Sequence, residues 1–195
     1  MFPLDEFLSR ADVRERHELP VRAPAPLVYE VASTFDLQSV PAVRAIFRMR
    51  ELVMGSSRRS DTAVARLDVP GLRKLGWGVL AERPGRMLVV GAACRPWQAD
   101  VVFTPLDASG FAAYDEPDAV RIAWTIEVDP VSTDVSRLAT ETRAMGTDAR
   151  ARERFRRYWR WARLGIVAIR RLMLPAMRRE AEHRWRDTID RRQQA

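Results

Sequence analysis

The feature that most constrains this fold is a long helical pattern near the carboxyl end, from Thr147 to roughly Asp190. Thr147 and Asp148 supply a hydroxyl and a carboxylate where the first backbone N–H groups of a helix would otherwise lack partners. No proline follows until Pro175, where we expect the helix to bend or break. The pattern therefore predicts one helix of many turns.

Apolar residues of this stretch recur at steps of three or four, which places them on one face of the helix. They are Phe155, Trp159, Ala162, Ile166, Ile169 and Met173. A helix this long with a single apolar stripe must lie across a large apolar surface. Since the residues before it have the pattern of strands, we expect that surface to be a curved antiparallel sheet.

The upstream residues predict a strand, two helices and then a meander of strands. The first strand covers 14–22, and the helices run from Pro26 to Asp36 and from Ser39 to Met54. Two strands, 76–83 and 86–94, flank the turn Pro84-Gly85 and predict a hairpin. The other expected strands are 64–68, 97–103, 111–114, 120–128 and 136–144. We expect a single domain, 1–195, with a leader at 1–12, a core at 13–185 and a tail at 186–195.

The last expected strand has two different faces. Leu138, Thr140, Thr142 and Ala144 lie on the face predicted to point inward. Arg137, Glu141 and Arg143 lie on the other face, where we expect contact with water and pairing across strands.

Positive charge is concentrated in the predicted long helix. Residues 147–195 hold 15 arginines and 6 acidic residues, a net charge of +9, whereas the whole chain has a net charge of +7. We interpret this charge as a solvated helix face, because the exposed aromatics or motifs of a nucleic-acid module are not evident. An anionic membrane surface is the weaker alternative, and the oligomeric state stays open.

Cysteine content and hydropathy predict a soluble cytoplasmic protein. Cys94 is the sole cysteine, so an intrachain disulfide is impossible and a reducing compartment is expected. Residues 1–16 lack the apolar core of a signal peptide. The most apolar stretch, Leu164 to Met177, is too short to span a bilayer and contains Arg170 and Arg171.

Three stretches carry a resemblance to a known superfamily. They are LPVRAPAPLVYEVASTFD (19–36), GWGVLAERPGRMLVVGAACRPW (76–97) and RIAWTIEVDPVSTDVSRLATETRAMGTDARARERFRRYW (121–159). With the order of elements, they resemble the START/Bet v 1-like (SRPBCC, polyketide cyclase-like) superfamily over roughly 13–185, in a bacterial branch of unknown function. The resemblance implies an α+β helix-grip fold. In it, a curved antiparallel sheet of six to seven strands wraps the long carboxy-terminal helix, two short helices follow the first strand, and a hydrophobic cavity lies between sheet and helix.

Large aromatic residues and a few polar ones are the candidates for lining such a cavity. The aromatic candidates are Trp77, Trp97, Phe103, Trp124 and Trp159, and the polar ones are Thr140, Thr142 and His17. Each aromatic residue taken singly is more often core filling, yet this fold usually leaves a cavity that some of them must border. His17 shares a strand face with Leu19 and Val21, and such a histidine is more often structural than functional.

Other site chemistries find little support in the sequence. Two histidines and one cysteine without paired spacing do not indicate a metal site. A nucleophile motif and a glycine-rich phosphate loop are also lacking, so we expect no cofactor.

Two functions follow as hypotheses. The first is binding of a small hydrophobic molecule of lipid, polyketide or aromatic type in the cavity. The second is a reaction resembling that of the polyketide cyclases and dehydratases, with His17 as the general base and the threonines orienting an enolate.

Overall fold

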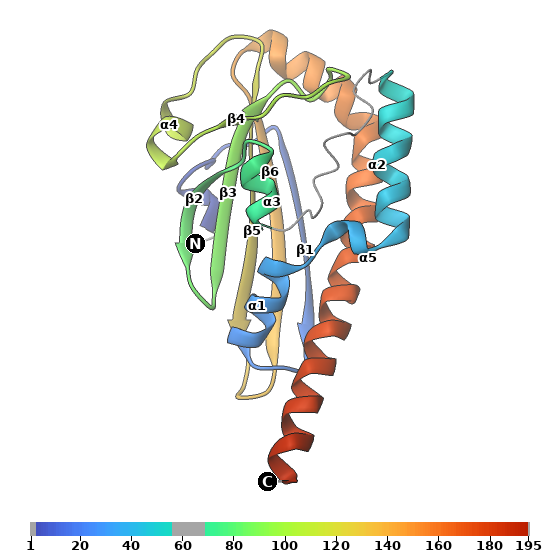
Figure 1. Ribbon diagram of the computed structural model, residues 1–195. Coiled ribbons are helices and arrows are strands. Elements are labelled where there is room, and N and C mark those ends of the chain that lie inside the picture. Colours follow the sequence, from blue (N-terminus) through green and yellow to red (C-terminus); the bar gives the residue numbers. More distant parts are fainter. Residues whose placement is uncertain (1–2, 56–68, 195) are drawn as a thin grey trace.

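The computed structural model describes residues 3–55 and 69–194, and these form a curved sheet with helices packed against it (Figure 1). All neighbouring strands are antiparallel, in the order β1-β6-β5-β3-β2, and β4 pairs with β3. The strands are β1 Val13–Val21, β2 Gly78–Arg83, β3 Met87–Cys94, β4 Thr104–Pro105, β5 Val120–Pro130 and β6 Ser136–Gly146.

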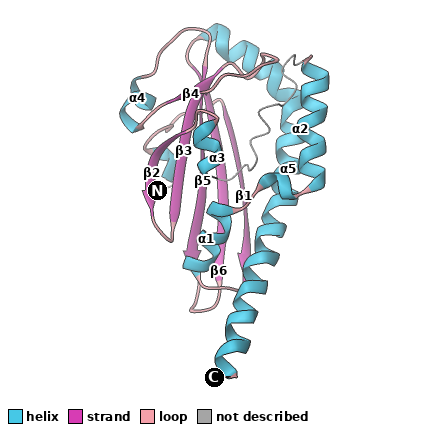
Figure 2. Cartoon of the chain, in the orientation of Figure 1, coloured by secondary structure: helices cyan, strands magenta, loops and turns pink. Residues whose placement is uncertain are grey.

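Five α-helices surround this sheet in the described residues (Figure 2). They are α1 Ala25–Thr34, α2 Pro41–Met54, α3 Val69–Lys74, α4 Ala108–Ala113 and α5 Ala149–Gln193, with 3-10 turns η1 at Pro3–Asp5 and η2 at Leu37–Ser39. Figure 1 shows that α5 crosses one end of the sheet and then runs down beside β1. The predicted fold class, an antiparallel sheet with a long carboxy-terminal helix and short helices after the first strand, is confirmed.

Helix α5 begins as its sequence predicts and continues further than predicted. The Asp148 side chain accepts a hydrogen bond from the Ala151 backbone N–H at 2.7 Å, which is an N-cap. Of the two alternatives predicted at Pro175, the break is wrong, since the helix continues without interruption to Gln193, and the bend stays a prediction. Met173, Leu174 and Met177 are buried around the proline, and their burial outweighs the lost backbone hydrogen bond.

The main core lies between one face of the sheet and the helices α1 and α5. Strand register places Leu88, Ile126 and Thr140 side by side on this helix-facing side, with His17 opposite Thr140. Buried residues of this cluster include Val28 and Val31 of α1 and Leu174 and Met177 of α5. The alternation of side chains along each strand therefore directs the apolar set toward the helices.

The opposite face of the sheet carries buried charges, which corrects one prediction. Glu141 and Arg143 were expected to meet water, but their side chains are 0% and 3% exposed. The segment after η1 covers them, because Arg143 donates to the Leu8 carbonyl and to the Asp5 carboxylate, each at 2.7 Å. The predicted cross-strand pairing does occur, between Arg16 and Glu141 at 3.2 Å.

The strands that the sequence predicts between β3 and β5 are not observed. The expected strand at 97–103 is an irregular segment, and the expected strand at 111–114 overlaps α4, which Asp107 caps by accepting from the Gly110 N–H at 2.7 Å. Phe111 is buried under the sheet from this short helix rather than from a strand. The expected strand at 64–68 lies outside the described residues.

Candidate functional site

A pocket of about 490 Å³ opens between the helix-facing side of the sheet and the first half of α5. Helix α2, the segment after α3 and the irregular segment that follows β3 complete its wall. The lining is mostly aromatic and aliphatic; its charged members are Arg50 and Asp100, and its hydroxyl-bearing members are Thr142 and Tyr158. Trp77 and Phe103 contact each other there, with ring centroids 5.2 Å apart.

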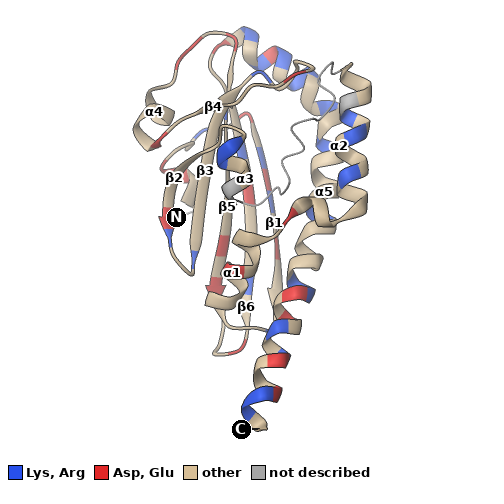
Figure 3. Ribbon diagram, viewed as in Figure 1, with Lys and Arg blue, Asp and Glu red and all other residues tan. Residues whose placement is uncertain are grey.

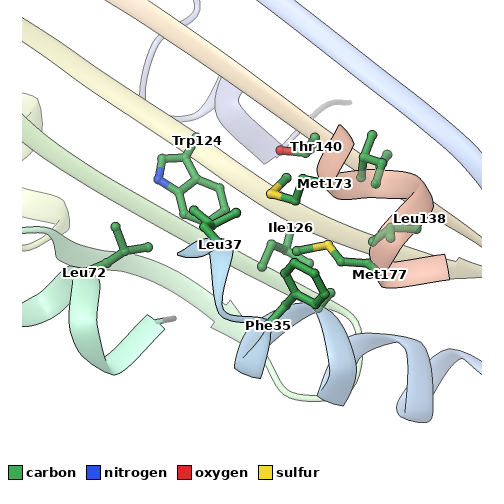
Figure 4. A pocket seen from close by; sticks show the side chains of 12 residues that line it. Phe35, Leu37, Leu72, Trp124, Ile126, Leu138, Thr140, Met173 and Met177 are labelled. Atoms are coloured by element: carbon green, nitrogen blue, oxygen red, sulfur yellow. The ribbon is translucent and has the colours of Figure 1, made fainter. Parts of the chain in front are cut away.

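A second, much narrower hollow of about 20 Å³ lies further along the same face (Figure 4). Phe35, Leu37 and Met177 close it from α1, η2 and α5, and Trp124 forms part of its wall. Trp124 also lines the large pocket, so its indole separates the two spaces. A hollow of about 20 Å³ has room for roughly one water molecule, so of these two spaces the large pocket is the one that can hold a ligand.

Arg170 projects from α5 into the interior between these two hollows. Its side chain donates to the hydroxyl of Thr140 at 3.1 Å and to the hydroxyl of Thr142. Thr140 lines the narrow hollow and Thr142 lines the large pocket. Burial lowers the pKa of Arg170 to about 10, and the charges of Glu15 and Glu141 oppose that shift. The guanidinium is therefore still charged at neutral pH.

Glu15 and His17 extend this polar group along the edge strand β1. Glu15 lies opposite Thr142 in the register and accepts from Arg163 at 2.5 Å. His17 Nε2 is 3.9 Å from the Glu15 carboxylate, and it is buried without a hydrogen-bond partner. Burial and the Arg170 charge lower the pKa of His17, while Glu15 acts in the opposite direction, so neutral imidazole is favoured.

Five of the eight residues predicted to bind a ligand line the large pocket: Trp77, Phe103, Trp124, Thr142 and Trp159. Thr140 lines the narrow hollow instead. Trp97 packs beside Phe155 and Val120, and the Arg154 guanidinium lies over its ring at 6.0 Å. His17 shares the face but is not among the residues that line the large pocket. These placements bring most candidates together, and their role in binding stays a prediction.

Arg170, Arg50 and Tyr158 were not among the predicted site residues, and the last two line the pocket. A signal for Arg170 exists in the sequence. It lies four residues after Ile166 and three before Met173, so it falls within the apolar stripe of the helix. A charged residue inside a stripe that must be buried needs polar partners, and Thr140 and Thr142 provide them.

Several chemistries lack support in the described part of the chain. Cys94 lines the pocket, but burial raises the pKa of its thiol to about 12, so the thiolate nucleophile is scarce at neutral pH. No cluster of three or more His, Cys, Asp or Glu residues among those described is suited to a metal ion. None of the described helices has both the length and the apolar character needed to cross a bilayer.

No family model matches the chain, and no curated protein matches it. Among solved structures, the chain is similar to the Zhui aromatase/cyclase from Streptomyces sp. R1128, at 14% identity over 88% of this chain and 94% of that one, with a TM-score of 0.30. It is also similar to the di-domain ARO/CYC BexL, at 15% identity over 83% of this chain and 46% of that one, with a TM-score of 0.28. Superpositions with such low TM-scores carry no argument, so the fold class rests on the arrangement of sheet and helices described above.

Proposed function

We propose that this protein binds a small, largely apolar molecule of lipid, polyketide or aromatic type in the pocket beneath α5. The observation that carries the proposal is the pocket of about 490 Å³ with its mainly aromatic and aliphatic lining. Pockets of roughly 300–1,000 Å³ with such a lining are typical of small-molecule sites.

The lining also supports a ligand with a flat or elongated body. Trp124 lines the pocket from β5, Trp77 and Phe103 line it from the segments before β2 and β4, and Trp159 and Ile166 line it from α5. Aromatic side chains contribute large contact areas and favour stacking on flat groups. Membership of the START/Bet v 1-like superfamily is part of this proposal, and the order of elements supports it.

Binding of the neutral fluorescent probe N-phenyl-1-naphthylamine to the purified protein tests the proposal. We expect saturable fluorescence enhancement by the wild-type protein, because transfer of the probe out of water into an apolar pocket raises its emission. Ala99→Trp places an indole at the pocket wall, where Ala99 is half-buried, and should reduce probe affinity at least about tenfold by filling the space.

Ala113→Trp on α4 is the matched control, since Ala113 is exposed and does not line the pocket. This variant should bind the probe as the wild-type protein does. Equal loss in both variants, or no saturable binding by the wild-type protein, would contradict the proposal.

The enzymatic alternative needs a base within hydrogen-bond reach of the bound molecule. His17 has a free Nε2 and a pKa lowered from its ordinary value, but it does not line the pocket. No observation therefore favours catalysis by His17 over simple binding.

A further inference from the structure

Arg170 is the most deeply buried arginine on the helix-facing side of the sheet, with 8% of its surface exposed. No carboxylate among the described residues lies within ion-pair distance of its guanidinium; its hydrogen-bond partners are the two threonine hydroxyls. A buried cation is normally paired with an anion, because loss of hydration is costly without one. The guanidinium of Arg170 could therefore be stabilised by an anion that enters its surroundings.

Hydrogen-bonding capacity at this position is only partly used. A guanidinium has five N–H donors, and two of them reach Thr140 and Thr142. The Nε atom of Arg170 is buried and has no hydrogen-bond partner among the described residues. Each threonine hydroxyl accepts from Arg170 and donates to no described residue, so its proton is available to an acceptor in the adjoining space.

The geometry connects this group to the large pocket. Thr142 lines the pocket, and Arg170 lies directly behind it. Ile166, one turn earlier on α5, lines the pocket as well. A hydroxyl that accepts from a cation becomes a stronger donor, so Thr142 is polarised toward any acceptor that enters.

Local charge also favours an anion. Glu15 and Glu141 are the acidic residues whose charges act on Arg170. Both are shared with other arginines, Glu15 with Arg163 at 2.5 Å and Glu141 with Arg14, Arg16 and Arg143, so positive charge is in excess around Arg170. Excess positive charge in a site with low-dielectric walls raises the local concentration of anions.

We propose that Thr142, polarised by the charge of Arg170 behind it, binds the carboxylate of an amphipathic acid whose apolar body occupies the large pocket. This inference rests on the proposed function and names the class of ligand. Two sources share this chemistry, a fatty acid and an aromatic acid. The aromatic lining can contact either an alkyl chain or an aromatic ring system. The carboxylate, which both kinds of acid share, is the group that we propose is recognised.

Displacement of N-phenyl-1-naphthylamine by matched pairs of compounds tests this inference. The pairs are decanoate with 1-decanol, and naphthalene-2-carboxylate with naphthalene-2-methanol. We expect the acid of at least one pair to displace the probe from the wild-type protein at about ten- to hundredfold lower concentration than its alcohol, the range of one charged hydrogen-bond pair. The pair with the larger preference for the acid shows whether the pocket favours an alkyl chain or an aromatic ring system.

Arg170→Met should abolish the preference for the acid while probe binding persists. Arg171→Met is the matched control, because Arg171 is the adjacent and exposed arginine, and it should retain the preference. Thr142→Val should weaken the preference severalfold and provides a second reading if Arg170→Met does not fold. Circular dichroism and thermal denaturation check the fold of each variant.

The outcomes separate this inference from the proposed function. Equal displacement by acid and alcohol in the wild-type protein overturns the carboxylate site and leaves apolar binding intact. Loss of the preference in Arg50→Met but not in Arg170→Met also overturns it, since Arg50 lines another part of the pocket wall. Absence of probe binding altogether contradicts the proposed function itself.

Discussion

Glu141 occupies the centre of the buried charge group on the sheet face opposite α5. Its carboxylate pairs with Arg14 at 2.8 Å, with Arg16 at 3.2 Å and with Arg143 at 2.6 Å. The backbone of Glu141 is also held, because its N–H donates to the hydroxyl of Thr125 on β5 at 3.1 Å. One buried carboxylate thus neutralises part of the charge of three arginines, of which Arg143 is buried and Arg14 is half-exposed.

Glu141→Gln should lower the free energy of unfolding by about 3 kcal/mol, because removing one partner of a buried ion group leaves the others uncompensated. Urea denaturation of the purified variant measures this change. Glu153→Gln is the control, since Glu153 pairs with Arg156 and Arg157 on the solvent side of α5. It should leave the urea midpoint nearly unchanged, and an equal shift in both variants would contradict the assignment.

The sequence correctly predicted which face of β6 each side chain points to, but it did not predict which of these side chains are buried. Alternation along β6 correctly separated Thr140 and Thr142 from Glu141 and Arg143. Alternation cannot show what covers a face, and here the segment around Leu8 covers the charged one. Arg170 was missed for a related reason, because its partners lie on β6, about thirty residues away in the chain.

Helix α5 shows what element-scale reasoning captures and what it overlooks. The cap at Asp148 correctly predicted where the helix begins. Of the predicted apolar stripe, Phe155 and Met173 pack against the sheet, whereas Ala162 and Ile169 line a groove between α5 and α2. The supposed break at Pro175 came from local propensity alone. Packing of Leu174 and Met177 into the core keeps the helix intact there.

Pro175→Ala should raise the free energy of unfolding by about 1–3 kcal/mol, because alanine restores the missing backbone hydrogen bond in the helix interior. Urea denaturation measures this gain. Pro26→Ala is the control, since Pro26 lies in the first turn of α1, where the backbone N–H needs no partner. A loss of stability in Pro175→Ala would show that the ring itself contributes to packing.

Prediction was reliable for the hairpin of β2 and β3 and poor for the segment between β3 and β5. Pro84-Gly85 marks a turn between two apolar runs, and Gly85 adopts φ +76° there, which favours glycine. In contrast, residues 97–103 mix apolar and polar residues and form pocket wall. Their conformation depends on contacts such as that between Phe103 and Trp77, which no local pattern contains.

In the carboxy-terminal half of α5, several basic side chains lie beside acidic ones on the same helix. Figure 3 shows basic and acidic residues alternating along the carboxy-terminal half of α5. Arg184 pairs with Glu180 at 2.7 Å, and His183 lies 3.2 Å from Asp187. These pairs fit the interpretation of a solvated helix face for this half, while contact with an anionic membrane stays an untested alternative.

The resemblance to the START/Bet v 1-like superfamily predicted a cavity between sheet and helix, but the sequence could not predict its volume. Its volume depends on how far α2 and α5 stand from the sheet, which is set by the packing of the whole molecule. Sequence periodicity assigns Trp124 and Trp159 to inward faces, yet it cannot distinguish an indole that fills a core from one that borders empty space.

Cys94 gives the protein a single chemical reporter of occupancy, because the chain has one thiol and this thiol lies in the pocket wall. A small thiol reagent such as methyl methanethiosulfonate can reach it through the pocket. Because burial raises the pKa of the Cys94 thiol to about 12, labelling is carried out at alkaline pH, where more of the reactive thiolate is present. Labelling followed by mass spectrometry should slow about tenfold at a probe concentration ten times its Kd, because only the empty fraction reacts. Labelling that ignores the probe would contradict the shared location, whereas slowing would let unknown ligands be screened without any assay of their chemistry.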